Sequence, residues 1–488
     1  MNKEQQQSSI KIGLRAFIGA AAIILILMIG SGIMTRVLPS GHYQRVKTEG
    51  RSSIVPNSFQ YAEKPDYPVW RWFTAPGEVL VSKDNLTVIT IILFIIFMSG
   101  SFTIMEDAGL VAYLLKGLIK RFRDNKYLLM AIIIFMFMFM AAFLGVYEGL
   151  VPLIVFIIPL AYSLGWDSLT GLGMSLLALA FGFSAAVTNP FTIAVAQKIS
   201  ELPLFSGAWL RIIFFLIVYG IVYLFVSTYA RKIEKNPESS AVYKLDKPLK
   251  EKFISQELED ETETSAKPEM TRALIWFSVC LTLALGFVVV SSMIPGISDY
   301  AFPLMGVLFL IGGVGSGFLA GLKGRQISRI FLKGTLNILP GIILILMAYS
   351  VKFIIDQGQI TDTILYSAST KIAGASPLKA VFLIYGLTLF MNFFIGSASA
   401  KAFLMMPILS PLADLVHITR QTAVLAFDFG DGFSNMIYPS NALLLIALGF
   451  TVVSYPKWIK WTLKLQAVML VLTSIFLVIA VKIGFGPF

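Results

Sequence analysis

Charged residues are scarce in this sequence. Of its 488 residues only 14% are Asp, Glu, Lys or Arg, and 57% are hydrophobic, whereas soluble domains carry about a quarter of their residues as charges. The composition therefore excludes soluble, fibrous and disordered proteins. Between clusters of charge lie uncharged runs of about 18 residues or more, long enough to cross a bilayer. These runs are Ala16–Ile33, Asn85–Met105, Tyr127–Tyr147, Ser168–Gln197, Ile212–Ala230, Ala273–Ser298, Ala301–Leu322, Ala380–Ala400 and Gly432–Pro456.

Cysteine and histidine are also rare. The single cysteine, Cys280, lies inside an apolar run, which excludes an intrachain disulfide and a thiolate metal cluster. The two histidines form no HExxH motif, and no run has the GK[ST] ending of a phosphate loop. We therefore expect no enzyme, no catalytic residue, no metal site, no cofactor and no ATP-driven transport by this chain alone.

Positive charge predominates, with a net charge of +11. The Lys and Arg residues gather at the ends of apolar runs, which is the positive-inside pattern of membrane proteins and not the face of a nucleic-acid-binding protein. Because Arg15 precedes the first apolar run, we place the N-terminus in the cytoplasm. That run lacks a cleavage site and predicts a retained helix of a multi-pass protein of the cell membrane.

The apolar runs predict an all-α polytopic membrane protein with about nine transmembrane helices and two re-entrant hairpins. We divide the chain into a first membrane repeat, a helix-poor cytoplasmic linker and a second, inverted membrane repeat. Their predicted bounds are 1–230, 231–271 and 272–488. Each repeat is expected to contain one hairpin and one broken helix. The hairpins are expected at about 127–164 and 378–416, and the broken helices at about 168–199 and 420–456.

A weak internal repeat supports this division. Gly182-Phe-Ser recurs as Gly432-Phe-Ser, and each copy is followed by a proline, Pro190 or Pro439. The positive-inside pattern places the second copy upside down relative to the first. Inverted repeats with broken helices near the membrane centre are typical of secondary transporters.

Polar residues inside the first repeat predict one half of a binding site. Asn189 and Pro190 interrupt an apolar run, and a proline there frees backbone carbonyls that need a partner in lipid. Glu148 and Gly149 lie at the predicted tip of the first hairpin. A kinked helix and an external loop, respectively, are the alternatives without a binding role.

The second repeat contains more of the polar residues that predict a binding site. Asp428, Asp431 and Asn435 share one predicted crossing with Pro439, Ser440 and Asn441. Ionisable groups in a membrane segment indicate function unless they lie at its outer mouth. The predicted tip of the second hairpin contains Ser397, Ser399 and Lys401.

Lys401 follows twenty-one uncharged residues and precedes twelve more, so a position at the membrane surface is disfavoured. Its charge requires a partner, which is Glu148, Asp428 or Asp431. The residue types and spacing alone leave these alternatives open.

Several motifs resemble the anaerobic C4-dicarboxylate carrier family of the DcuC and YfcC type, which is related to aminobenzoyl-glutamate transporters. The matching stretches are Leu38-Pro-Ser-Gly-His-Tyr, Gly165-Trp-Asp-Ser-Leu-Thr-Gly, Asn189-Pro-Phe-Thr, Leu202-Pro-Leu-Phe-Ser-Gly, Pro407-Ile-Leu-Ser-Pro-Leu-Ala-Asp and Phe429-Gly-Asp-Gly-Phe-Ser-Asn. The resemblance implies a homodimeric elevator-type carrier whose mobile core contains both hairpins and both broken helices. Members of the family are labelled as basic amino-acid antiporters or as dicarboxylate carriers.

Two positions depart from the family pattern. Lys401 and Asp428 stand where the family has glutamine-like residues, and this suggests a Lys401–Asp428 pair. An ammonium group at Lys401 would occupy the place of a coupling cation. Of the two candidate coupling ions, Na⁺ and H⁺, this disfavours Na⁺ and favours exchange or proton coupling.

Together these features predict a secondary active transporter of small carboxylate-bearing solutes, with amino acids ahead of C4-dicarboxylates. Substrate binding is assigned to Glu148, Gly149, Asn189, Pro190, Ser397, Ser399, Asn435, Pro439, Ser440 and Asn441. Charge selectivity and coupling are assigned to Lys401, Asp428 and Asp431. The alternative from another class is a channel. The expected partners are a small-molecule substrate, the lipid bilayer and a second copy of the chain, with no nucleic acid.

Overall fold

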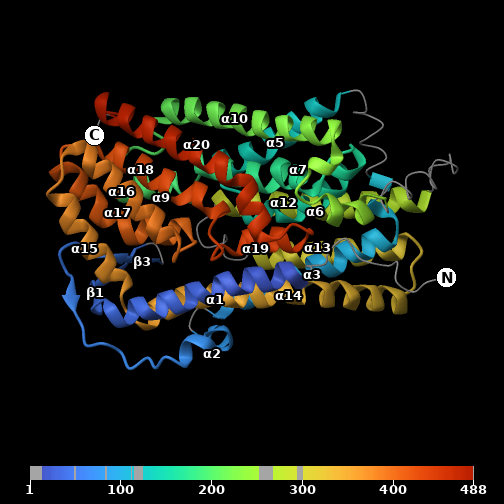
Figure 1. The fold of residues 1–488 in the computed structure, drawn as a ribbon, viewed down its shortest axis with the longest axis horizontal. Helices are drawn as coiled ribbons and strands as arrows, with labels where there is room; N and C mark the ends of the chain where they lie inside the picture. Colours follow the sequence, from blue (N-terminus) through green and yellow to red (C-terminus); the bar gives the residue numbers. More distant parts are fainter. Residues whose placement is uncertain are drawn as a thin grey trace.

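The fold is almost entirely helical. The structure, a computed structural model, describes residues 14–48, 51–82, 85–111, 113–114, 125–251, 268–293 and 301–486. Among these residues, seven helices are long and apolar enough to cross a membrane, and four shorter apolar segments accompany them. Several of the longer helices run along the long axis of the molecule (Figure 1). The prediction of an all-α polytopic membrane protein is confirmed, while the nine crossings and the re-entrant hairpins remain predictions.

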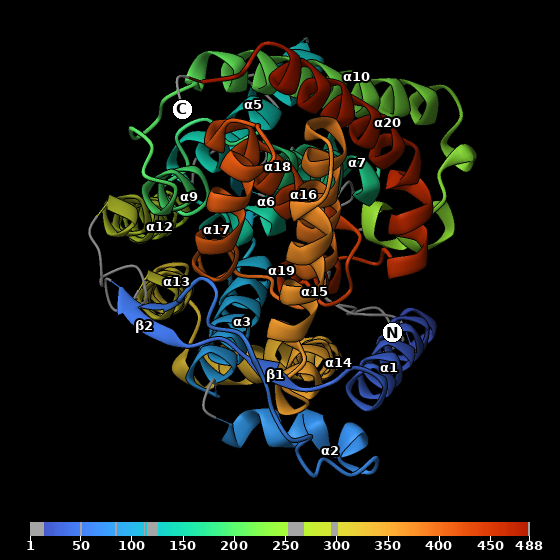
Figure 2. The ribbon, with the colours of Figure 1, turned by 90° about the vertical axis from the view of Figure 1, so that its left-hand side faces the viewer.

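One set of helices, which we call the first helix group, packs around α3 (Figure 2). Its members are α1 (Leu14–Val37), α2 (Arg71–Glu78), α3 (Asn85–Asp107), α12 (Pro268–Met293), α13 (Ala301–Leu319) and α14 (Gly324–Gln357). Small residues let α3 and α14 approach closely, because a Cβ atom on Gly334 would lie 2.7 Å from the carbonyl oxygen of Ser99. The Ser99 hydroxyl donates a hydrogen bond of 2.8 Å to the carbonyl of Gly334. Close contact of this kind stabilises helix pairs in lipid.

Most of the remaining helices, short and long, form the second helix group, which lies above the first in Figure 2. Its members are α5 (Lys126–Leu144), α6 (Val151–Ser163), α7 (Ser168–Leu172), α8 (Ala178–Ser184), α9 (Ile193–Ile199), α10 (Ala208–Lys235), α16 (Pro377–Asn392), α17 (Ala398–Leu415), α18 (Arg420–Gly432), α19 (Ala442–Gly449) and α20 (Tyr455–Lys482). Short helical turns at Gly173–Leu177 and Phe433–Met436 extend α7 into α8 and prolong α18. The two groups meet where α19 contacts α14 and where α20 contacts α1.

Four short strands, which were not predicted, follow α1. β1 (Gly41–His42) pairs with β4 (Gln60–Tyr61), and β2 (Arg45–Thr48) pairs with β3 (Arg51–Ile54), both antiparallel. They lie beside α15 (Thr361–Ala373), where Arg45 forms a 2.8 Å ion pair with the buried Asp362. The rings of Phe59 and Tyr366 stack at 4.2 Å. These contacts join a segment near the N-terminus to the second half of the chain.

Two helices of the second helix group are interrupted. The first helix ends at Ser184 and resumes at Ile193, and the second ends at Met436 and resumes at Ala442. The second broken helix is shorter than the predicted 420–456, because α19 ends at Gly449 and α20 begins at Tyr455. Pro456 lies in the first turn of α20, where its missing N–H costs no helical hydrogen bond. A proline there starts a new helix.

The linker differs from its prediction in one respect. α10 continues to Lys235, α12 begins at Pro268, and residues 243–251 are helical although the linker was expected to be helix-poor. This helical segment docks on the second helix group through Asp246. Its carboxylate accepts hydrogen bonds of 2.9 Å from the Tyr162 hydroxyl and 2.7 Å from the backbone N–H of Ser168. Buried contacts therefore order this part of the linker.

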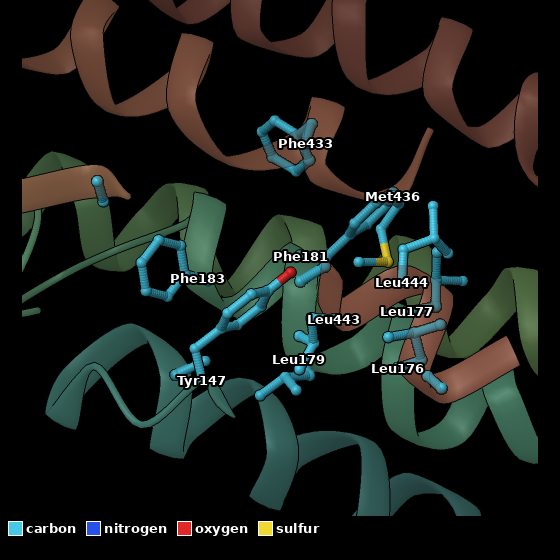
Figure 3. Packing of buried hydrophobic residues seen from close by; sticks show 14 of the residues in the cluster. Tyr147, Leu176, Leu177, Leu179, Phe181, Phe183, Phe433, Met436, Leu443 and Leu444 are labelled. Atoms are coloured by element: carbon cyan, nitrogen blue, oxygen red, sulfur yellow. The ribbon is translucent and has the colours of Figure 1, made fainter. Parts of the chain in front are cut away.

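The Gly-Phe-Ser copies lie where the two broken helices cross. A Cβ atom on Gly432 would lie 2.4 Å from the Cα atom of Ser184, so only glycine permits this contact. The rings of Phe181 and Phe433 meet edge to face at 5.1 Å. Figure 3 shows these two rings beside Phe183 and Met436. The crossing holds the two halves of the chain together at their breaks.

We expect Gly432→Ala to lower the stability of the protein by about 1–3 kcal/mol, because the added methyl group forces the crossing apart. Gly386→Ala is the matched control, since a Cβ atom on Gly386 meets nothing within 4 Å. Thermal unfolding of both variants in detergent, followed by gel-filtration fluorescence, measures the difference. Equal unfolding temperatures would contradict the packing argument.

The docked linker should respond to pH through Asp246. Burial, helped by the nearby Asp167, raises the pKa of Asp246 from 3.8 to about 7, although the hydrogen bonds from Ser168 and Tyr162 oppose the change. The docked form thus binds a proton more tightly than an exposed aspartate. Docking is therefore strongest at low pH, weakens as the pH rises from about 4 to about 7, and changes little above that through this group.

Hydrogen exchange of residues 237–251, corrected for intrinsic rates, should accordingly show more protection near about pH 5 than near about pH 8. Asp246→Asn should remove this difference. Glu251→Gln, which changes an exposed acid on the same helical segment, should keep it. The same pH response in Asp246→Asn would show that another group causes it; Asp167 and Lys250 are the charged neighbours to examine.

Candidate functional site

Lys401 lies at the centre of a fully buried polar network. Its side chain, in the first turn of α17, has no exposed surface, and its ammonium group donates hydrogen bonds to the carboxylate of Asp431 and to Oδ1 of Asn392. Nδ2 of Asn392 lies within hydrogen-bond distance of the Asp431 carbonyl, Ser434 Oγ and Asn435 Oδ1, at 2.6, 2.7 and 3.0 Å. The network therefore joins α16, α17 and α18.

The suggested Lys401–Asp428 pair is wrong, because Asp431 is the partner of Lys401. The two acids are three residues apart on α18, so their side chains are offset by almost one helical turn along the same helix. Only Asp431 reaches Lys401. Asp428 instead lies near Thr192 and Arg211.

Asp428 is the polar side chain in this region with the fewest hydrogen bonds for its burial. Its side chain is 1% exposed, and neither carboxylate oxygen has a hydrogen-bond partner of normal geometry among the described residues. The hydroxyl of Thr192, at the start of α9, lies nearby and is also unsatisfied. Unsatisfied buried acids are rare and costly.

Arg211 is a buried cation that the sequence analysis missed. It lies in the first turns of α10, is 2% exposed, and donates from Nε to the carbonyl of Val187 at 3.1 Å. A second bond of 3.3 Å runs from its guanidinium to the carbonyl of Phe205. The signal was present, because Arg211 is the one charged residue between Glu201 and Arg231. An isolated charge in an apolar run indicates a functional site.

The first break is closed by hydrogen bonds to the end of α5. The backbone N–H of Val187 donates to the carbonyl of Ala142 at 2.9 Å, and the Thr188 hydroxyl donates to that of Phe143 at 2.9 Å. Asn189 donates to the carbonyl of Ala141 at 3.1 Å and accepts from the N–H of Phe191 at 2.8 Å. The side chain of Asn189 thus forms hydrogen bonds both with the end of α5 and with the segment that leads into α9. Pro190 follows at a position where no N–H is needed.

The second break is closed in the equivalent way. The Ser440 hydroxyl donates to the carbonyl of Phe393 at 2.6 Å, and the Tyr438 hydroxyl donates to that of Leu389 at 3.0 Å. The acceptors Phe143 and Phe393 are 250 residues apart, which is the spacing of the Gly-Phe-Ser copies. Asn441 caps α19 and donates to Asn435 Oδ1 at 3.0 Å, while Pro439 lies inside the break.

Apart from Lys401, the residues of the predicted hairpin tips are less involved in this network. Ser397 caps α17, Ser399 is 8% exposed, and Gly149 lies in a short turn, Glu148–Leu150. The side chain of Glu148 lies outside what the structure describes. The structure therefore brings Lys401, Asp431, Asn435 and Asn441 together in one network, and it leaves a pairing of Lys401 with Glu148 without support.

Comparison with known proteins adds a second line of evidence. The family model "C4-dicarboxylate anaerobic carrier" matches residues 19–482. The chain belongs to this carrier family. The "Putative basic amino acid antiporter YfcC" of Escherichia coli K12 is 30% identical over 95% of this chain and 96% of its own. An uncharacterized protein of Haemophilus influenzae is 24% identical over 82% of this chain and 77% of its own.

Among solved structures, that of the Alcanivorax borkumensis YdaH transporter is similar over 96% of this chain and all of its own. The sequence identity is 17% and the TM-score is 0.43. Membership of the carrier family makes this chain a multi-pass membrane transporter of a small molecule.

The Lys401–Asp431 pair yields a stability prediction. Lys401→Gln leaves the carboxylate of Asp431 buried without a counter-charge, and we expect a loss of about 3–5 kcal/mol in stability. The double variant Lys401→Gln with Asp431→Asn removes both charges, so we expect it to recover most of this loss. Thermal unfolding in detergent of the two single variants and the double variant gives the coupling energy. Additive losses would contradict a direct pair.

Proposed function

We propose that this chain is a secondary active transporter that exchanges small carboxylate-bearing solutes, amino acids foremost, across the cell membrane. The observation that carries the proposal is the buried network of Lys401, Asp431, Asn392 and Asn435 beside the second helix break. A charged network in a membrane segment is costly and indicates a translocation site. The name of the Escherichia coli relative supports amino acids and an antiport mechanism.

The substrate carboxylate is assigned to the start of α17. The first N–H groups of a helix and its dipole attract anions, and Ser397 and Ser399 lie at that end. Ser397 is exposed, so a solute can reach it. Glu148, on the first predicted tip, is proposed to hold the cationic end of an amino acid, and Gly149 to allow close approach.

The ammonium group of Lys401 is proposed to replace a coupling cation. It is fully buried and bound to Asp431 and Asn392, oxygen ligands of the kind that a monovalent cation would use. With a tethered cation in place, a sodium requirement is not expected. Exchange of solutes, or coupling to protons, is the remaining way to drive transport.

For the conformational cycle we propose an elevator mechanism in a homodimer with the N-terminus in the cytoplasm. Both helix breaks, and the network between α16, α17 and α18, lie in the second helix group. That group is the proposed mobile core, and the first helix group is the proposed scaffold. Movement of a core with its complete site requires no rearrangement of the buried ion pair.

A C4-dicarboxylate carrier is the second candidate, and the description of the matched family favours it. Both candidates use carboxylate recognition at α17. They differ at the other end of the solute, where a dicarboxylate needs a second anion site. A channel would need an open path, and the buried ion pair gives no support to one.

The test is counterflow in proteoliposomes that contain the purified protein. Vesicles are loaded in turn with arginine, ornithine, aspartate, succinate or buffer alone, and the uptake of each labelled solute is measured. We expect saturable uptake only when a basic amino acid is inside, because exchange requires a returning solute. Exchange of succinate alone would favour the dicarboxylate candidate.

Two results would contradict the proposal. Non-saturable conductance without counterflow would identify a channel. Uptake into buffer-loaded vesicles that follows a sodium gradient would overturn the role of Lys401 as a tethered cation. Protein-free vesicles control for leakage.

A further inference from the structure

Four buried charges near the helix breaks, Lys401, Asp431, Arg211 and Asp428, are not arranged alike. Lys401 and Asp431 form a direct ion pair, whereas Arg211 and Asp428 influence each other without an ion pair. Arg211 uses its donors on the carbonyls of Val187 and Phe205 instead. One acid is therefore neutralised by contact, whereas neither oxygen of Asp428 has a hydrogen-bond partner of normal geometry in the part of the chain that the structure describes.

The groups that face Asp428 come from three elements. Among the described residues they are Thr192 at the start of α9, Arg211 on α10 and Asp431 on its own helix. Lys401 lies beyond Asp431 and is bound to it. Asp431 disfavours a second negative charge nearby, while Arg211 favours one. An ionised Asp428 in this site lacks the hydrogen bonds that a buried carboxylate needs.

The size of the site limits what can supply the missing positive charge. Both oxygens of Asp428 are enclosed by protein, with almost no accessible surface. A proton needs no space and converts one oxygen into a donor, for which the unsatisfied Thr192 hydroxyl is an acceptor.

We propose that Asp428 is a proton-binding site whose protonation is coupled to the first helix break. The proton is taken from water on one side of the membrane to form the neutral acid and is released to water on the other side, so that one proton, and with it one positive charge, crosses the membrane per cycle. This deepens the proposed transport function by naming the group that carries the coupling proton.

The coupling has a structural basis, because Thr192 and Arg211, which lie near Asp428, also form hydrogen bonds with residues of the first helix break. The backbone N–H of Thr192 donates a hydrogen bond of 3.2 Å to Oδ1 of Asn189. Arg211 donates to the carbonyl of Val187, just before Asn189. When Asp428 loses its proton, the carboxylate attracts the Arg211 guanidinium away from Val187. The charge of Asp428 is thereby transmitted to the backbone of the break.

The first test measures the titration itself and does not depend on transport. Infrared difference spectra between acidic and alkaline buffer, recorded on protein that carries Asp246→Asn so that the other buried acid expected to titrate is silent, should contain a carbonyl band of a buried protonated carboxyl group. Asp428→Asn should lose this band, and Asp428→Glu should keep it at a shifted position. Asp414→Asn is the control, because Asp414 is half exposed and paired with Arg420. An unchanged band in Asp428→Asn, or no band in the Asp246→Asn parent, would overturn the proposal.

The second test measures coupling in proteoliposomes with a pH-sensitive dye in the lumen. We expect solute uptake by the wild type and by Asp414→Asn to move protons, and Asp428→Asn to lose this movement together with the pH dependence of exchange. Asp428→Glu, which retains a carboxyl group, should retain both and so controls for folding. Proton movement by Asp428→Asn would refute the proposal.

The two proposals can fail separately. A protein that shows the infrared band of Asp428 but no counterflow with any solute would contradict the proposed transport function and leave the proton site intact. Counterflow with proton movement that survives in Asp428→Asn would contradict only the proton site.

Discussion

The buried ion pair between Lys401 and Asp431 is the interaction on which the second helix group depends. Two charges that leave water lose several kcal/mol of solvation each, and they recover it only through close contact and further hydrogen bonds. Asn392 supplies those bonds, because its side-chain oxygen accepts from Lys401 and its side-chain nitrogen donates to the backbone carbonyl of Asp431. Because the three residues come from α17, α18 and α16, their contact fixes the relative positions of these helices. The network thus joins the second broken helix to the helices on either side of the predicted hairpin tip.

The two helix breaks obey the same constraint at the level of the backbone. Inside a membrane every free N–H and C=O group needs a partner in the protein. At the first break the carbonyls at the end of α5 accept from the backbone N–H of Val187 and the hydroxyl of Thr188. At the second break the carbonyls at the end of α16 accept from the hydroxyls of Tyr438 and Ser440. Each break therefore closes the open end of the helix that precedes the tip in its own half. Side chains that were predicted to bind substrate, such as Asn189 and Ser440, are used for this purpose, which leaves the helix ends and the tips to meet a solute.

Local signals explain which features could be predicted from the sequence. Prolines and polar residues inside apolar runs marked both breaks, because they change the backbone where they stand. The partner of Lys401 could not be predicted, since the choice between Asp428 and Asp431 depends on how α18 is rotated against α17. Asn392 gave no signal as a single amide in an apolar run, whereas Arg211 did and was overlooked. The strands between residues 41 and 61 are held by α15, through Arg45 and Asp362, and no local pattern encodes that contact.

The contrast between the two acids of α18 leads to a division of roles. Asp431 is neutralised by a cation that belongs to the chain, so its charge is constant and suits a structural role in every conformation. Among the residues that the structure describes, Asp428 has a cation near it but none in contact, and Arg211 is held by the backbone of the first break. A charge balanced at a distance changes its energy when the surrounding backbone moves, whereas a charge balanced by contact does not. A transporter needs both kinds: a fixed pair that keeps the core together, and a responsive group that links an exchangeable charge to the movement of the chain.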